Sequence, residues 1–198
     1  MDTQIDIDLQ ILEGIKKIYT VIENLYNRIS FKYQITPLQL KILHFLYNQK
    51  NRDTNLKRLS LEMYLTSPTI SKSVKNLIKK EFLKTYNTNR NQKEKYLDLT
   101  DKALPILNEL EKEIKKIIKL ISKIDENKLK KREIIEYFSA IIRKFLENGY
   151  INKANMCNLC IFYDDDRNYC RFLGEILEYK RIGCPDFVEK TFKNVKNF

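Results

Sequence analysis

The stretch from Thr54 to Thr100 constrains the fold more than any other part of the chain. A helix is predicted to begin near Ser67, because Thr66 or Ser67 can cap free N–H groups and Pro68 has the fixed φ and missing donor that suit a first helical turn. Apolar residues then recur at helical spacing, so one face is expected to pack while the other faces stay polar and cationic. These apolar residues are Ile70, Val74, Leu77 and Ile78.

A two-stranded hairpin is predicted directly after this helix. Two runs with strand-forming residues, 83–88 and 96–100, flank a polar tip at 89–93 that contains turn-forming Asn and two cations. A shorter helix and a turn are expected within 54–66. The order short helix, turn, second helix and hairpin describes a winged helix-turn-helix.

The exposed faces of the second helix have the chemistry of a DNA major-groove reader. In such a helix, side chains near the N-terminus contact base edges and lysines bind phosphates. From Ser67 to Tyr96 the sequence has eight Lys or Arg residues and two Glu, an excess that favours double-stranded DNA as partner. The alternative, an ordinary amphipathic surface helix, does not account for the hairpin. The predicted DNA contacts are Ser67, Pro68, Thr69, Ser71, Lys72, Lys75, Asn76, Arg90 and Lys93.

A series of short motifs, in the same order and spacing, resembles the MarR family of winged-helix transcriptional regulators. The resemblance covers roughly residues 8–148. It implies a homodimer that binds DNA and a small aromatic effector bound between the dimer helices and the winged helix. The chain departs from the family pattern where a Gly is usual, at Glu81 and Ala103, and where the wing has Asn91-Gln92-Lys93 in place of Asp-Arg-Arg. The motifs are Ile35-Thr36-Pro37-Leu38-Gln39, Ile42-Leu43, Leu59-Ser60, Leu65, Pro68-Thr69-Ile70-Ser71, Val74, Leu77, Phe82-Leu83 and Leu97-Asp98-Leu99-Thr100.

Long apolar helices are predicted on both sides of the winged helix. Apolar residues repeat every three or four positions from Ile11 to Ile29, and again in 101–149 up to the stop at Asn148-Gly149. A small DNA-binding core cannot cover so much apolar surface. The surplus predicts a homodimer whose recognition helices lie about one DNA turn apart.

The single histidine, His44, lies in the apolar run of the helix that Thr36 caps and Pro37 begins. No titratable group is placed beside it by sequence spacing. It is therefore predicted to be a partly buried packing residue rather than a ligand or an acid–base group.

All four cysteines follow Met156, at Cys157, Cys160, Cys170 and Cys184. In a reducing cytosol this grouping favours a metal site over disulfides. Four thiolates suit Zn2+ or an iron–sulfur cluster, and the lack of a second C-x-x-C pair favours a [4Fe-4S] cluster. Zn2+ and a redox dithiol or disulfide arrangement are the alternatives. The pattern also resembles small high-potential-type iron–sulfur subdomains that are accessory parts of some enzymes, whereas Asp164-Asp165-Asp166 is expected to be a plain exposed loop.

Composition and charge limit the function classes. The 198 residues carry a net charge of +11, and no apolar run is long enough to span a membrane. We therefore expect a soluble cytoplasmic protein without a membrane partner. No Ser-His-Asp set, phosphate-binding loop or paired carboxylates appear, which argues against an enzyme.

The fold expected from these patterns is mainly α. It comprises an N-terminal dimerisation helix at 1–34, a winged helix-turn-helix with a two-stranded wing at 35–100, C-terminal dimerisation helices at 101–149 and a four-cysteine metal module at 150–198. The expected function is a repressor-like transcription regulator whose cysteine site senses redox or metal state or stabilises the dimer. The alternative is a protein-interaction or electron-carrying protein that uses the winged helix as a docking module.

Overall fold

The computed structural model consists of two compact units, Met1–Ile121 and Ser122–Phe198, and each is treated by itself. The predicted dimerisation segment 101–149 therefore spans both units. In the part of the chain that the structure describes, no helix is long and apolar enough to cross a membrane. The described residues are 3–49, 53–88, 91–124, 130–184 and 186–190.

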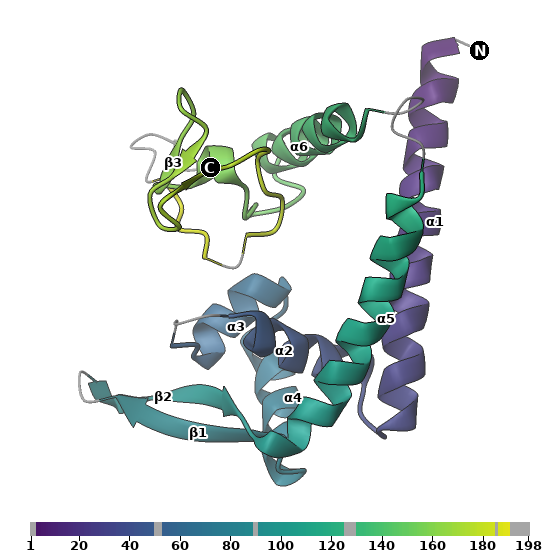
Figure 1. The fold of residues 1–198 in the computed structure, drawn as a ribbon. Coiled ribbons are helices and arrows are strands. Elements are labelled where there is room, and N and C mark those ends of the chain that lie inside the picture. The colour runs from purple at the N-terminus through teal and green to yellow at the C-terminus, as the bar shows by residue number, and fades with distance from the viewer. Residues whose placement is uncertain (1–2, 50–52, 89–90, 125–129, 185, 191–198) are drawn as a thin grey trace. The chain divides into compact units, whose positions relative to one another are not determined.

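The first unit is a winged helix joined to two long helices, α1 and α5, that lie side by side (Figure 1). The predicted mainly α fold with a two-stranded wing is confirmed. A short 3-10 turn, Asp101–Ala103, precedes α5, as expected from Pro105 near the start of that helix. The elements are α1 (Thr3–Lys32), α2 (Pro37–Asn48), α3 (Leu56–Met63), α4 (Ser67–Lys79), β1 (Leu83–Thr88), β2 (Asn91–Leu99) and α5 (Leu104–Ser122).

Helix α2 is the centre of the first unit, because it packs against both α1 and α4. It begins as predicted: the Thr36 side chain accepts a hydrogen bond from the Gln39 N–H, the Gln39 side chain accepts from the Thr36 N–H, and Pro37 follows the cap. Such a capping box satisfies two otherwise unpaired backbone donors. Burying each large apolar side chain of the core contributes about 1.5–3 kcal/mol. The fully buried ones include Leu40, Ile42, Leu43, Leu59, Ile106, Leu107 and Leu110.

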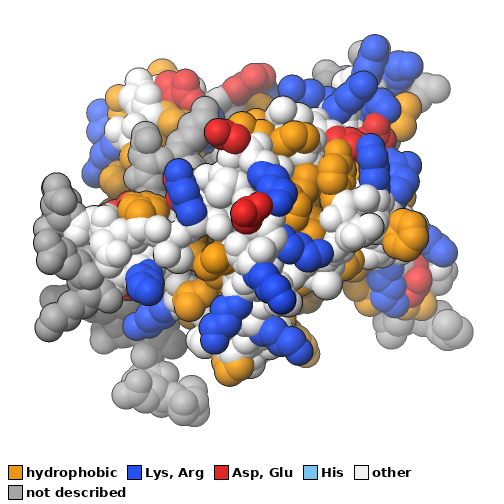
Figure 2. Space-filling model, turned by 90° about the horizontal axis from the view of Figure 1, so that it is seen from below, with side chains coloured by type: hydrophobic (Ala, Val, Ile, Leu, Met, Phe, Trp, Pro, Cys, Tyr) orange, Lys and Arg blue, Asp and Glu red, His pale blue; other side chains and the backbone are white. Residues whose placement is uncertain are grey.

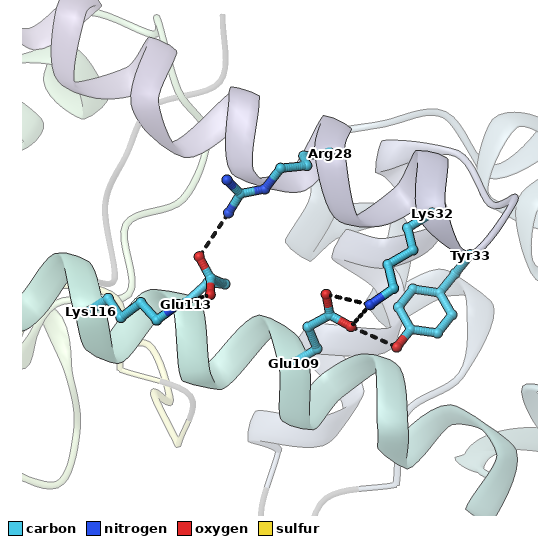
Figure 3. A network of polar contacts seen from close by, with 6 residues as sticks. All are labelled: Arg28, Lys32, Tyr33, Glu109, Glu113 and Lys116. Carbon is cyan, nitrogen blue, oxygen red and sulfur yellow. Dashed lines mark hydrogen bonds and ion pairs between the residues drawn. The ribbon is translucent and has the colours of Figure 1, made fainter.

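Polar contacts fix the register of α1 against α5 (Figure 3). Arg28 lies 2.8 Å from Glu113, and Lys32 lies 2.6 Å from Glu109. The Tyr33 hydroxyl donates to the same Glu109 carboxylate at 2.7 Å. Hydrogen bonds from Lys32 and Tyr33 hold the pKa of Glu109 below its usual value. Exposed ion pairs contribute at most about 1 kcal/mol each, so they orient the two helices while buried Ile29 supplies more of the stability.

A large part of the apolar stripe on α1 and α5 is exposed among the described residues of the first unit. Ile18 is 63% exposed and Ile118 is 58% exposed, although both lie on helices whose other ends are buried in the core. The stripe predicted from the sequence therefore extends beyond the winged-helix core. Other exposed apolar residues of these helices are Ile7, Leu9, Leu12, Val21, Leu120 and Ile121.

The second unit combines one helix with a small three-stranded antiparallel sheet in the order β3-β4-β5. Helix α6 stops where the sequence predicts, because Gly149 adopts a left-handed φ of 74° just beyond its end. The core of this unit is built around two of the cysteines, with Tyr163, Leu177 and Phe187 beside them. The elements are α6 (Lys131–Glu147), the 3-10 turn Cys157–Leu159, β3 (Tyr163–Asp164), β4 (Tyr169–Cys170) and β5 (Glu175–Ile176).

Candidate nucleic-acid interface

Helix α4 buries one face as the sequence predicts. Ile70 and Leu77 are fully buried and Val74 is 3% exposed, so these three residues anchor the helix in the core of the first unit. Ile78, also expected on this face, lies at its margin and is 37% exposed. The angular spread of an α-helix explains this, since one stripe covers only part of its circumference.

The opposite face of α4 is polar, cationic and exposed. Helix α4 contains no acidic residue, and of the predicted contacts on this helix only Ser71 is half-buried. Thr66 is the N-cap residue but its side chain does not cap the helix; its hydroxyl instead lies 2.9 Å from that of Thr69. The N–H groups of the first turn therefore remain available for an anion, which a helix N-terminus attracts. The exposed predicted contacts are Ser67, Pro68, Thr69, Lys72, Lys75 and Asn76.

Figure 2 views the molecule from below Figure 1 and shows Lys and Arg side chains spread over that face, with few acidic side chains among them. In α4 the lysines are Lys72, Lys75 and Lys79. A cationic surface of this kind attracts a polyanion, and its affinity for the polyanion falls as the salt concentration rises.

Glu81, the second residue after the end of α4, joins the helix to the wing. Glu81 has a left-handed φ of 63°, a conformation that favours glycine. Its N–H donates to Ile78 and the N–H of Phe82 donates to Leu77, each at 2.9 Å. The Thr100 hydroxyl donates to the Glu81 carbonyl at 2.6 Å, and Lys102 pairs with the Glu81 carboxylate at 2.9 Å. A non-glycine residue is thus held in place by contacts at the base of the wing.

The wing is an antiparallel hairpin whose strand β2 also contacts the segment before α3. Leu83 faces Leu99 across β1 and β2, and a bulge follows Tyr86. The Leu97 N–H donates to the Thr54 carbonyl at 2.8 Å, so the segment before α3 lies along β2. The Tyr86 hydroxyl donates to Asp53 at 2.7 Å, and burial, with that hydrogen bond, raises the pKa of Tyr86 to about 12.

The two predicted wing contacts remain predictions. Arg90 lies outside the described residues, and Lys93 belongs to β2 although its side chain lies outside the described part of the structure. The predicted DNA-contact residues whose side chains the structure describes therefore all lie on α4.

His44 has titratable partners that the sequence did not indicate. Its Nδ1 lies 2.6 Å from the Tyr26 hydroxyl on α1, and its Nε2 lies 2.9 Å from a Glu111 carboxylate oxygen on α5. His44 is half-buried as expected, but it links three helices. The expectation of a simple packing role is therefore corrected, because its partners stand 18 and 67 residues away and local spacing cannot reveal them.

The four predicted cysteine ligands all line one small pocket in the second unit. Cys157 and Cys160 are buried, Cys170 and Cys184 are half-buried, and all four are free thiols. Burial raises the pKa of the Cys157 thiol, and the charges of Cys170 and Cys160 raise it further. Among the described side chains, no three His, Cys, Asp or Glu groups form a set that could hold a metal ion as they lie.

The acidic run beside the cysteines is a set of ion pairs. Asp164 lies 2.8 Å from Arg167, whose hydrogen bond lowers the pKa of Asp164, and Asp165 lies 2.7 Å from Lys180. Asp164 lies half-buried in β3, so the expectation of a plain exposed loop is wrong for this residue, whereas Asp165 and Asp166 are exposed as expected.

The family model of winged helix DNA-binding domains matches residues 35–103. The matched range contains α4, the wing and the contacts at Glu81 that connect them. A comparison with curated protein sequences gave no match.

Solved structures of transcription regulators have the same fold. Staphylococcus aureus MarR, solved with salicylate and kanamycin, is 22% identical with a TM-score of 0.58, over 71% of this chain and 93% of its own. S. aureus MepR in complex with DNA is 18% identical with a TM-score of 0.52, over 64% and 93%. The regulator BldR of Sulfolobus solfataricus is 19% identical with a TM-score of 0.53, over 73% and 99%. The chain therefore has the fold of MarR-type regulators.

Proposed function

We propose that this protein is a dimeric, sequence-specific DNA-binding transcription regulator of MarR type that acts as a repressor. The observation that carries the proposal is the division of α4 into a buried face, Ile70, Val74 and Leu77, and an exposed face without any acidic residue. That helix lies in the range that matches the family model of winged helix DNA-binding domains. A major-groove reader needs this combination of anchored and accessible faces.

The exposed residues of α4 divide by chemistry into two roles. Ser67, Thr69 and Asn76 have hydroxyl or amide groups that can hydrogen-bond to base edges or phosphates. Lys72 and Lys75 lie on the exposed face and bind phosphates, so they fix the position of the helix on the duplex. Repression then follows if the bound dimer covers a promoter.

A second copy of the chain is the proposed partner of the exposed apolar stripe on α1 and α5. Residues such as Ile18 and Ile118 are more than half exposed in the single chain. An interface between two copies would cover these residues. It would also position the two α4 helices to enter neighbouring major grooves of the DNA.

A small aromatic acid is the proposed effector. A cavity of about 440 Å3 lies between α1 and α5, with Leu25 and Ile117 on its apolar wall and with Arg28 and Lys116, both paired with Glu113, at its polar side. S. aureus MarR was solved with salicylate, a molecule of this class. An aromatic carboxylate would place its ring on the apolar wall and would replace Glu113 as the partner of Arg28 or Lys116.

The cysteine-containing second unit is the proposed sensor of redox or metal state, or a support of the dimer. All four of its thiols lie around one pocket. A metal or redox group bound in that pocket would make the stability of the regulator depend on the redox state or metal supply of the cell.

Binding to duplex DNA from upstream of the protein's own gene tests the proposal. We expect fluorescence anisotropy to give tighter binding to this duplex than to a scrambled one, and at least a tenfold loss in the variant K72E/K75E. The matched control is K112E/K115E, which makes the same charge change at exposed positions of α5 with the same spacing. Equal binding of both variants, or no binding of the native protein to either duplex, favours a winged helix that docks on protein.

A further inference from the structure

The pocket in the second unit brings together every cysteine of the chain. Cys157 begins the 3-10 turn and Cys160 directly follows it, Cys170 comes from β4, and Cys184 comes from the loop that follows Arg181. Residues up to 27 positions apart in sequence thus surround one space, although no disulfide joins them. Convergence of four free thiols is the first requirement of a thiolate-bound metal centre.

The walls of the pocket are apolar. The side chains of Phe162 and Phe172 have ring centroids 5.5 Å apart, and Leu173 and Leu177 line the same space. Ionised thiolates in such surroundings repel one another and lose their hydration, so they need positive charge between them. A positively charged metal centre supplies that charge.

The backbone around the thiols is already ordered. The Arg181 N–H donates to the Cys157 sulfur at 3.1 Å, and the Cys157 N–H donates to the Arg181 carbonyl at 3.2 Å. The Cys184 N–H donates to the Asn155 carbonyl at 2.7 Å. An N–H bonded to a cysteine sulfur stabilises its thiolate form and is one of the ways in which proteins set the properties of iron–sulfur clusters.

The sequence positions of the thiols favour a cluster over a single Zn2+ ion, because zinc ribbons usually have a second C-x-x-C pair and Cys170 and Cys184 stand alone. A tetrahedral Zn2+ binds each sulfur at about 2.3 Å, so its four sulfurs must nearly touch. Within the described residues no three ligand side chains form such a set.

We propose that Cys157, Cys160, Cys170 and Cys184 each bind one iron of a [4Fe-4S] cluster in this pocket. In a cluster each thiolate binds a different iron, so the sulfurs lie at the corners of a larger cage. When bound, such a cluster supplies a one-electron redox centre. The proposal names the group bound by the second unit, whose role as a sensor was proposed above. It rests on the proposed function only for the biological role of the cluster, because iron and sulfide are measured without DNA.

The test is the composition and visible spectrum of the full chain purified without oxygen. We expect a brown protein with a broad visible absorption band, and iron and acid-labile sulfide at about four each per chain. The single variants C160S and C170S should each lose most of this absorption. The control D165N changes an acidic residue of the same unit that pairs with Lys180, and it should keep the absorption of the native protein.

Three outcomes overturn the proposal: a colourless protein with one zinc per chain, a metal-free chain with disulfides, and cysteine variants that keep full iron and sulfide. Circular dichroism and the DNA binding of each variant show whether its first unit is folded. The composition of the native chain decides the matter even if a cysteine variant fails to fold. A native protein that holds the cluster but binds no DNA would refute the regulator and leave this proposal standing.

Discussion

His44 Nε2 lies 2.9 Å from Glu111 Oε1, which connects α2 at the centre of the winged helix to the long helix α5. The other ring nitrogen contacts the Tyr26 hydroxyl of α1 at 2.6 Å. Both contacts are satisfied together when the Tyr26 hydroxyl donates to Nδ1 and the Nε2–H donates to Glu111. The chain's single histidine thus joins three helices that meet beside the DNA-binding core.

Replacing His44 by Phe should lower the free energy of unfolding by about 1–3 kcal/mol, because it leaves the buried Tyr26 hydroxyl without its acceptor. Chemical denaturation measures the change. The double variant Y26F/H44F removes both partners, so its loss should be smaller than the sum of the two single losses. Strict additivity would contradict the inferred bond.

Replacing Glu81 by Gly should stabilise the protein by about 1 kcal/mol, because Glu81 holds a left-handed φ of 63° that glycine adopts without strain. The lost ion pair with Lys102 is exposed and offsets little. The control E81Q keeps the strain and removes the charge, so its denaturation midpoint should stay close to that of the native protein. A destabilised E81G would show that the ion pair outweighs the strain.

The acid sensitivity of the first unit should depend on Glu109. Hydrogen bonds from Lys32 and Tyr33 lower its pKa in the folded state. A lowered pKa contributes stability that is present above the unfolded value of about 4.3 and is lost as the pH falls through the folded value. E109Q should therefore be less stable than the native protein at pH 7, with the difference shrinking towards pH 3.

Thermal unfolding across that pH range measures the effect. The control E13Q removes a carboxylate from an exposed pair with Lys16 on α1, and its curve should run parallel to that of the native protein. A constant difference between E109Q and the native protein at all pH values would contradict the assignment.

The double variant I18E/I118E should turn the proposed dimer into a monomer, because it places charges in the exposed apolar stripe of α1 and α5. Light scattering coupled to gel filtration measures the mass. K17E/K115E changes exposed lysines on the same two helices and should remain dimeric. A native protein that is monomeric at micromolar concentration would remove the basis of this prediction.

Local features of the sequence predicted much of the fold. Pro68 and the spacing of Ile70, Val74 and Leu77 placed α4 and its buried face, since helical periodicity is set by neighbouring residues. Thr36 and Pro37 placed the start of α2 for the same reason. The grouping of cysteines indicated one site, and their side chains do line one pocket.

Contacts between distant residues could not be predicted in this way. Neither Tyr26 nor Glu111 has a sequence spacing that marks it as a partner of His44. The left-handed backbone at Glu81 is stabilised by Thr100 and Lys102, about twenty residues later. The capacity of the four cysteines to bind a metal centre also depends on distances between their sulfurs, which spacing in the chain does not determine.

The salt dependence of DNA affinity tests the central claim most directly. Each phosphate contact contributes about 0.9 to the slope of log affinity against log salt concentration. If Lys72 and Lys75 bind phosphates, K72A/K75A should bind duplex DNA more weakly and with a slope shallower by about 1.8 per chain. The same slope and affinity as the native protein would contradict the assignment of α4 as the DNA-binding helix.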